Sequence, residues 1–418
     1  MSDKRKCVQK KTYVWNALAG LVNASEAVIV LAVVNRAFGG VEAGILAFAF
    51  SISNLAMTVG KFGMRTLQVT DANKENSISL YFFSRIITFF IMFFLVILYL
   101  AFSFVFKSYS IYKCHLIFLL FLLYSAEVVE DVFLSEYQRQ GRLDFGAKMF
   151  TIRWFVSLVV LCFACCFVGL RRALLFANIV SFVLLCVFLL HYSKRLNISI
   201  NGASIFNRFY KVFDLLRMAF PLFISSFSYL YLNNIQKFAI DKYLAEPDQA
   251  VFGYIAMPVF VLPLLSSFVI QPSLVYVTNA YHERKFTIFS KSIKKNLLFL
   301  LTMFLACEAG AFFLGVPVLN IIYKTDISVY KYDLMILLVA GAFLALANYM
   351  SVLLTIMRKQ RLSMYIYLIG SLIGTITAYC FTYMFGIRGS CYSYVLTLFV
   401  TSVVFALVCC LEINRALK

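Results

Sequence analysis

The stretch at residues 124–144, YSAEVVEDVFLSEYQRQGRLD, places three acidic side chains in a run that is long enough to span a membrane. Glu127, Glu130 and Asp131 fall on one stripe of an α-helix, because residues three and four apart lie on the same face. A carboxylate at membrane depth is costly unless it meets water or a cation. The stretch therefore predicts a spanning helix that turns this stripe toward a wet cavity or a cationic partner, and away from lipid.

The composition of the whole chain indicates a polytopic membrane protein. Of its 418 residues, 62% are hydrophobic and only 14% are charged. A helix needs about 20 apolar residues to cross the bilayer core, and about 12 such stretches follow one another along the chain. We therefore predict an all-α integral membrane fold with almost nothing left over for a soluble domain. The predicted spans lie near residues 13–35, 43–62, 80–105, 113–135, 149–169, 173–193, 214–236, 251–275, 296–316, 334–357, 363–385 and 389–411.

The net charge of +19 is explained by membrane topology. With the N-terminus in the cytoplasm, Lys and Arg residues at the span ends divide about 26 inside to 10 outside, which satisfies the positive-inside rule. Both termini are then cytoplasmic, and the basic surplus requires no nucleic-acid partner. The first apolar run is full length and lacks a small-residue cleavage site, so we expect it to be retained as a span.

The sequence predicts no metal site and no cofactor. Most of the eleven cysteines lie inside spans, where a thiol behaves as a small apolar group, so we interpret the Cys162-x-x-Cys165 pair as packing. The three histidines lie at span ends or in loops, and none has a partner at a metal-ligand spacing.

The first span carries a single polar stripe. Asn16, Gly20, Asn23 and Glu26 follow one another at helical spacing, with the carboxyl group near mid-membrane. A helix–helix interface, in which the glycine allows close approach and the asparagines bridge helices, explains every member of the stripe except Glu26. We therefore favour a helix that lines a cavity.

Four cations border the same inner half of the membrane as the acidic stripe: Lys61, Arg65, Arg85 and Arg153. Snorkelling to the headgroups would explain any one of them alone. Because all four accompany the three carboxylates, the sequence predicts a charge cluster between the second and fifth spans.

A basic segment at the middle of the chain divides it into two halves. We predict an N-terminal six-helix lobe at residues 1–200, a cytoplasmic amphipathic linker at 201–213 and a C-terminal six-helix lobe at 214–418.

The halves show a weak internal repeat. Residues 35–42 line up with 241–248, and residues 138–143 resemble 357–362. Each half has an even number of spans, so both begin on the same side of the membrane. The sequence therefore predicts two six-helix bundles related by a pseudo-two-fold axis along the membrane normal.

The second half has fewer charges and more backbone breaks. Asn233, Lys237 and Asp241 lie one turn apart near the predicted outer end of the seventh span. The eighth span contains three prolines, which remove backbone hydrogen bonds and predict bends; they are Pro258, Pro263 and Pro272.

Several stretches of the chain resemble bacterial polysaccharide repeat-unit flippases, of the O-antigen and capsule type, in the multidrug/oligosaccharidyl-lipid/polysaccharide exporter superfamily. These stretches are GMRTLQVTD at residues 63–71, YQRQGRLD at 137–144, PLFISSF at 221–227 and KFAID at 237–241. The chain departs from the family at Gln236, where a proline often precedes the lysine.

The resemblance implies two six-helix bundles around a central cavity and a function in the bacterial cytoplasmic membrane. It implies transfer of an undecaprenyl-diphosphate-linked oligosaccharide from the inner to the outer leaflet, with polysaccharide assembly enzymes as partners. A diphosphate needs basic groups in a wet cavity, and the residues that we assign to it are Arg65, Arg85 and Arg153. The residues assigned to the sugar are Asn16, Asn23, Asn233 and Asn234. Ion pairing, gating, or coupling to a proton or sodium ion is assigned to Glu26, Lys61, Glu127, Glu130, Asp131, Lys237 and Asp241.

Two other classes of function compete with this hypothesis. A cation-coupled multidrug antiporter of the same superfamily would share the fold. A membrane glycosyltransferase or polysaccharide polymerase normally carries catalytic carboxylates in an external loop, whereas the predicted outer loops here are short, so we predict that the protein is not an enzyme.

The acidic stripe lies toward the cytoplasmic end of its span. For its three carboxylates we therefore favour a role in an inner gate.

Overall fold

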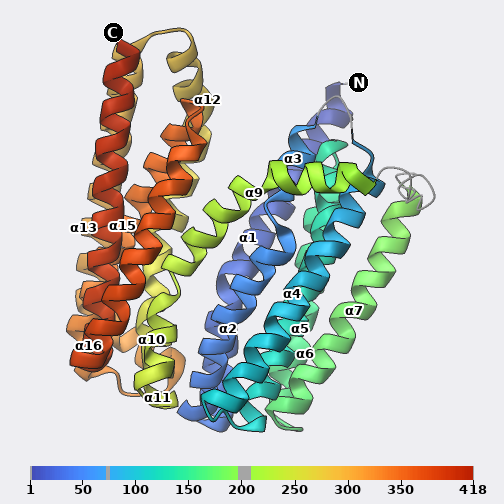
Figure 1. The fold of residues 1–418 in the computed structure, drawn as a ribbon, viewed down its shortest axis with the longest axis vertical. Helices are drawn as coiled ribbons and strands as arrows, with labels where there is room; N and C mark the ends of the chain where they lie inside the picture. Colours follow the sequence, from blue (N-terminus) through green and yellow to red (C-terminus); the bar gives the residue numbers. More distant parts are fainter. Residues whose placement is uncertain (1, 72–75, 196–208, 418) are drawn as a thin grey trace. The chain divides into compact units, whose positions relative to one another are not determined.

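The computed structural model describes residues 2–71, 76–195 and 209–417, and the regular elements in these ranges are all helical (Figure 1). The first part of the chain forms α1 (Ser2–Phe38), α2 (Gly40–Lys61), α3 (Met64–Thr70), α4 (Ile78–Phe106), α5 (Ile111–Arg139), α6 (Leu143–Cys165) and α7 (Leu170–Arg195). The second part forms α9 (Phe209–Leu232), α10 (Ile235–Tyr243), α11 (Glu246–Ala256), the 3-10 helix η1 (Met257–Phe260), α12 (Val261–His282), α13 (Phe286–Gly310), the π-helix η2 (Ala311–Gly315), α14 (Val316–Tyr323), the 3-10 helix η3 (Ser328–Tyr330), α15 (Lys331–Ile356) and α16 (Gln360–Leu417).

The predicted all-α membrane fold is confirmed. Among the described residues, ten helical segments are long and apolar enough to cross a membrane. The last of them, in α16, has non-helical backbone angles at Gly386, between the predicted spans 363–385 and 389–411. The 29-residue helix α5, which carries the acidic stripe, is not among these ten segments.

The chain forms two compact units, residues 1–227 and 228–418, and the boundary between them falls inside α9. The predicted linker lies mostly outside the described residues, which resume at Phe209. From there the first turns of α9 pack through Val212 and Leu215 against Leu80 and Tyr81 of α4. The predicted lobe boundaries at residues 200 and 214 stay a prediction.

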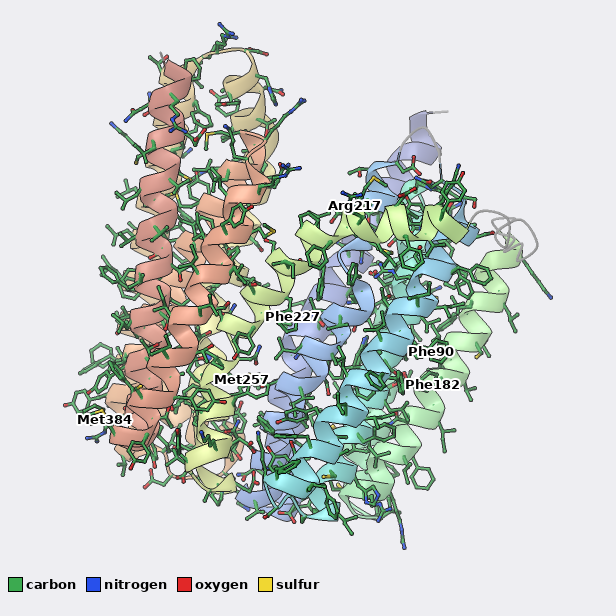
Figure 2. All side chains as sticks on the ribbon, in the orientation of Figure 1. Phe90, Phe182, Arg217, Phe227, Met257 and Met384 are labelled. Atoms are coloured by element: carbon green, nitrogen blue, oxygen red, sulfur yellow. The ribbon has the colours of Figure 1, made fainter. Side chains whose placement is uncertain are left out.

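Within the first unit, α5 is the central helix. It contacts α2, α3, α4, α6 and α7, and its acidic stripe is buried. By contrast, α4 presents large apolar side chains outward, among them Phe90 (Figure 2), which is 67% exposed, and Phe106, which is 72% exposed. This arrangement follows from composition, because an apolar surface can face lipid whereas a charged stripe requires protein around it.

A tight turn separates α2 from α3. Phe62 and Gly63 both adopt left-handed backbone angles, with φ of 47° and 67°, which ends α2 and redirects the chain. The ring of Phe62 stacks on that of Phe223 in α9, with centroids 4.4 Å apart. A Cβ atom on Gly63 would lie 2.9 Å from Cβ of Leu222. The turn is therefore pressed against α9, and it fixes the start of the helix that carries Arg65.

The seventh predicted span is broken near its end. The helix α9 stops at Leu232 and α10 starts at Ile235, although the sequence has Gln236 where the family often has a proline. The amides of Asn233 and Asn234 donate to the carbonyl oxygens of Tyr229 and Leu230, at 2.8 and 2.9 Å. These side chains satisfy carbonyls in the last turn of α9, so the break does not depend on proline.

The predicted eighth span is also interrupted. It is made of α11, η1 and α12, and the 3-10 helix begins at Met257, directly before Pro258. Pro263 and Pro272 lie inside α12. Proline removes a backbone donor and crowds the preceding turn, which accounts for the irregular helix.

We expect Gly63→Ala to destabilise the protein more than Gly141→Ala. Both glycines have positive φ, 67° and 72°, so each alanine incurs a left-handed cost of about 1–2 kcal/mol. Only at position 63 does the added Cβ also collide, since nothing lies within 4 Å at position 141. Overpacking adds about 1–3 kcal/mol. Thermal unfolding in detergent measures the difference, and equal melting temperatures for the two variants would contradict the proposed contact with α9.

Candidate functional site

The acidic stripe of α5 is matched by cations from the helices around it. The shortest nitrogen–oxygen distance is 2.5 Å in each of three pairs, Lys61–Glu127, Arg153–Glu130 and Arg85–Asp131. The predicted charge cluster is therefore present in the structure, and its partners come from α2, α4 and α6. We call these pairs the α5 charge ladder.

The pair between Arg153 and Glu130 is the deepest part of the ladder, with both side chains 0% exposed. Arg153 donates from Nε and Nη2 to the same oxygen of Glu130, at 2.9 and 2.5 Å. Its third nitrogen donates to the hydroxyl of Ser181 in α7, at 2.8 Å. Arg153 thus ties α5, α6 and α7 together, and its guanidinium is not accessible to a ligand.

Asp131 is shared by two arginines that differ in exposure. Arg85 is 3% exposed and donates to Asp131 at 2.5 Å and to the carbonyl oxygen of Lys61. Arg65 is 42% exposed, lies 3.4 Å from Asp131, and donates to Gln138 at 3.1 Å. Because Arg85 alone satisfies the charge of Asp131, Arg65 can move to another anion without leaving a buried carboxylate unpaired.

Glu26 does not join the ladder. It is 3% exposed and accepts a hydrogen bond from the hydroxyl of Tyr124 in α5. The Tyr124 ring lies edge-on to Phe50 and Trp154, with centroids 6.0 and 5.2 Å away. The carboxyl group of Glu26 therefore sits among aromatic rings, with a hydroxyl as its hydrogen-bond donor.

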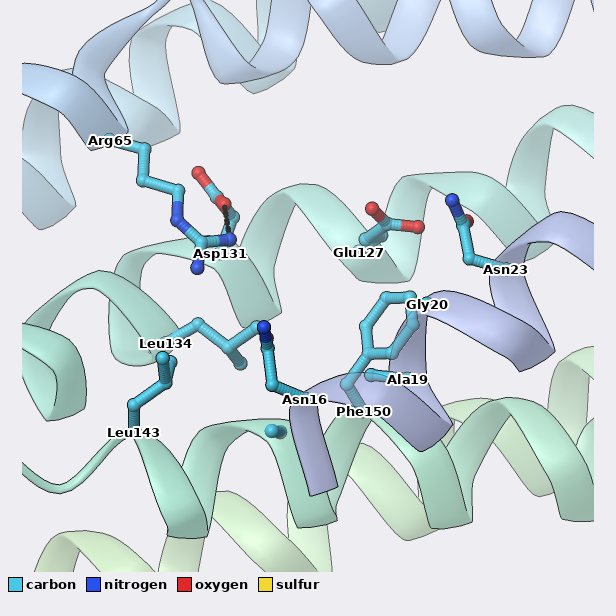
Figure 3. Close-up of a pocket in the computed structure, with 11 residues that line it drawn as sticks. Asn16, Ala19, Gly20, Asn23, Arg65, Glu127, Asp131, Leu134, Leu143 and Phe150 are labelled. Atoms are coloured by element: carbon cyan, nitrogen blue, oxygen red, sulfur yellow. Dashed lines mark hydrogen bonds and ion pairs between the residues drawn. The ribbon is translucent and has the colours of Figure 1, made fainter. Parts of the chain in front are cut away.

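A pocket of about 270 Å³ opens beside the ladder, between α1, α3, α5 and α6 (Figure 3). Figure 3 shows Arg65 at one end with its link to Asp131, and Glu127 near Asn23 at the other. The asparagines that the sequence assigned to a cavity, Asn16 and Asn23, are both exposed and both line it. The full lining is Asn16, Ala19, Gly20, Asn23, Arg65, Glu127, Asp131, Leu134, Leu143, Ala147 and Phe150.

The other predicted site residues belong to the second unit. Asn233 and Asn234 are 5% and 7% exposed, and their amides satisfy the end of α9, while Oδ1 of Asn233 accepts from Tyr394 at 2.9 Å. Lys237 and Asp241 lie one turn apart in α10. Within the part of the chain that the structure describes, the Lys237 side chain makes no ion pair and no hydrogen bond.

Sequence reasoning missed three features of this site. Phe150 lines the pocket, but phenylalanine is common in membrane spans and gives no signal of its own. Tyr124 belongs to the decisive stretch, yet only the fold shows that it meets Glu26. Glu136 lies 2.7 Å from Arg139 and accepts from Gln68, which ties α5 to α3. The spacing of Glu136 and Arg139, three residues apart in one helix, could have predicted their ion pair.

The fold is that of a multi-pass membrane protein, and the family follows from the sequence comparison. The family model described as polysaccharide biosynthesis protein matches residues 10–275, more than half of the chain, so the chain belongs to this family. No curated protein matches the chain.

Solved transporter structures share the fold. The lipid II flippase MurJ, in an inward closed conformation, is similar with a TM-score of 0.74 and 13% identity, over 94% of this chain and 87% of that one. An inward-facing multidrug resistance MATE family transporter of the MOP superfamily is similar with a TM-score of 0.68 and 17% identity, over 95% of both chains. The eukaryotic MATE transporter AtDTX14 is similar with a TM-score of 0.66 and 14% identity, over 99% of this chain and 98% of that one. At these identities the likeness is one of fold.

We expect Arg153→Met to destabilise the protein strongly and a second change, Glu130→Gln, to restore much of the loss. The single substitution leaves Glu130 buried without its cation, which costs about 3–5 kcal/mol. The double variant replaces the charged pair with two neutral side chains of similar length. Thermal unfolding and the monodisperse yield in detergent measure both effects. A single variant as stable as the wild type would show that the pair is not desolvated.

Proposed function

We propose that the protein flips an undecaprenyl-diphosphate-linked oligosaccharide repeat unit from the inner to the outer leaflet of the bacterial cytoplasmic membrane. In this proposal both termini are cytoplasmic and transport proceeds by alternating access. Membership of the polysaccharide biosynthesis family supports the substrate class. The observation that carries the proposal is the pocket, where a 42% exposed guanidinium lies beside two exposed asparagines.

In this proposal Arg65 contacts the diphosphate. A planar guanidinium donates two parallel hydrogen bonds to phosphate oxygens, and these charge-assisted bonds are among the strong ones. Its present contact with Asp131 is long, 3.4 Å, and Arg85 remains with Asp131 when Arg65 leaves. The exchange of a carboxylate for a phosphate therefore creates no unpaired charge.

Arg85 and Arg153 take a different role in the proposal from the one that the sequence suggested. They are 3% and 0% exposed, and their donors are directed at Asp131 and Glu130. We propose that they hold α5 in place and position the pocket, and that the diphosphate does not touch them.

The sugar would bind along α1. The side-chain amides of Asn16 and Asn23 each offer a donor and an acceptor, which suits sugar hydroxyls. The apolar face of Phe150 suits the carbon–hydrogen face of a sugar ring. In the same proposal Asn233 and Asn234 act on the helix break and not on the sugar, because their amides are already used within α9.

We assign the remaining charged residues of the site to two roles, an inner gate and the coupling of transport to an ion. Lys61 and Glu127, 27% and 11% exposed, form the most accessible of the three close pairs, and we propose that it opens and closes as an inner gate. Glu26 accepts its hydrogen bond from the hydroxyl of Tyr124 and stands outside the charge ladder, so we propose it as the group that carries a coupling proton or sodium ion.

Deletion of the protein tests the function directly. We expect the labelled lipid-linked repeat unit to accumulate in the inner leaflet and surface polysaccharide to be lost. Re-expression of the wild type should restore both. Normal outward transfer in the deletion strain would overturn the proposal, and loss of cation-dependent drug efflux with intact surface polysaccharide would favour the multidrug antiporter.

We expect Arg65→Ala to lower the initial rate of outward transfer about tenfold or more at low substrate concentration, since it removes charged hydrogen bonds to phosphate. Folding should be retained because Arg85 still pairs with Asp131. The matched control is Arg217→Ala, which removes an exposed arginine from α9 outside the pocket. Transfer from proteoliposomes measures both variants. If they slow equally, Arg65 has no special role.

A further inference from the structure

The helix α3, which carries Arg65, is too short to hold itself in place. It has seven residues, and an isolated helix of fewer than about 12 residues is marginal in water. Among its residues, all of which the structure describes, only Met64 and Gln68 are buried. Leu67 is half-buried against the apolar cluster at Leu80. The position of Arg65 therefore depends on the contacts that α3 makes along its face and at its two ends.

One face of α3 is held on α5 by polar side chains. Arg65, Gln68 and Asp71 follow one another at a spacing of three, so they lie on the same side of the helix and of its C-terminal end. The amide of Gln68 donates to the carbonyl oxygen of Val132 at 3.1 Å and to the carboxylate of Glu136 at 3.4 Å. The contacts of Arg65 with α5 thus belong to a longer row.

The C-terminal end of α3 is fixed by Arg139. The guanidinium of Arg139 is 6% exposed and lies 3.5 Å from Asp71 and 2.7 Å from Glu136. It also donates to the carbonyl oxygen of Asn76, which precedes α4, at 3.1 Å. Asp71 accepts in turn from the hydroxyl of Tyr81 in α4, at 3.2 Å. Arg139 therefore joins the end of α3 to both α4 and α5.

Two of the stretches that resemble the exporter family, GMRTLQVTD and YQRQGRLD, meet at this contact. The first begins at the turn of Gly63, which lies against α9, and ends at Asp71. The second contains Arg139. Because α3 is held at both ends, the guanidinium of Arg65 between them has a fixed place beside the pocket.

We propose that Asp71 and Arg139 are positioning residues, which set the affinity of the pocket for an oxyanion by holding Arg65 beside it. This inference rests on the proposed function, in which Arg65 contacts the diphosphate. When only a fraction of the molecules presents the binding group, the apparent affinity falls in proportion to that fraction. Release of Asp71 from Arg139 therefore weakens anion binding without any change to the residues that line the pocket.

The test measures the affinity of the purified protein for inorganic diphosphate by titration calorimetry. Asp71→Asn removes the charge, keeps the shape and leaves Arg139 paired with Glu136, so folding should be retained. We expect the dissociation constant to rise about threefold or more, which corresponds to about a third of the molecules keeping the binding arrangement. Asp71→Glu, which restores the carboxylate, should bind nearly as tightly as the wild type.

The matched control is Asp144→Asn. The side chains of Asp71 and Asp144 are almost equally buried, 10% and 7% exposed, and each pairs with an arginine. The partner of Asp144 is Arg142, two residues away in the chain and outside α3. We expect Asp144→Asn to bind diphosphate like the wild type, and an equal weakening by the two asparagine variants would overturn the inference.

A double variant separates positioning from a general loss of stability. Because Asp71 acts through Arg65, Arg65→Ala combined with Asp71→Asn should bind no more weakly than Arg65→Ala alone. Hydrogen exchange of the amides at residues 64–70 should be faster in Asp71→Asn than in the wild type, and unchanged in Asp144→Asn. A double variant that binds more weakly still, or unchanged exchange in α3, would contradict the positioning role.

Transfer of the lipid-linked oligosaccharide in proteoliposomes keeps the inference apart from the proposed function. If Asp71→Asn binds diphosphate less tightly than the wild type but the wild type transfers no lipid, the proposed function has failed and the positioning role stands. If lipid is transferred and Asp71→Asn matches the wild type in both assays, the function stands and the inference is overturned. A wild type that binds no diphosphate overturns the inference as well.

Discussion

The pairing of the α5 carboxylates with cations is the interaction on which the first unit depends. Three acidic groups on one stripe cannot be left in lipid, so α5 must be covered by neighbours that bring positive charge. The neighbours that do so are α2, α4 and α6, through Lys61, Arg85 and Arg153. The central position of α5 is therefore a consequence of electrostatics, whereas α4, with its exposed phenylalanines, can lie at the lipid boundary.

Exposure divides the charges into two kinds. Arg153, Glu130 and Arg85 are almost completely buried, and such pairs hold a structure in place, because breaking one leaves an uncompensated charge. Arg65 and Lys61 keep one side toward solvent, so water can replace a lost partner at little cost. The proposed transport would use both kinds, since the buried pairs keep the helices in place while the exposed groups exchange partners.

The sequence alone predicts the membrane fold, the spans and the existence of the charge cluster, since composition and the spacing of charges decide these. It does not predict which cation meets which carboxylate: Lys61, Arg65 and Arg85 all border one stripe, and only helix packing chooses Arg85 as the close partner of Asp131. That Phe150 lines the pocket could not be predicted either, for a different reason. Its role depends on which face of α6 adjoins α1, and aromatic residues in spans carry no such information.

The turn at Gly63 links the pocket to a helix that both compact units share. The structure places Leu222 of α9 against this glycine, with no space for even one more carbon atom, and Arg65 follows two residues later. The boundary between the compact units falls inside α9, a few residues past the contact with this turn. Because Leu222 lies directly against Gly63, a displacement of α9 at this contact must also displace the turn that leads into the helix carrying Arg65.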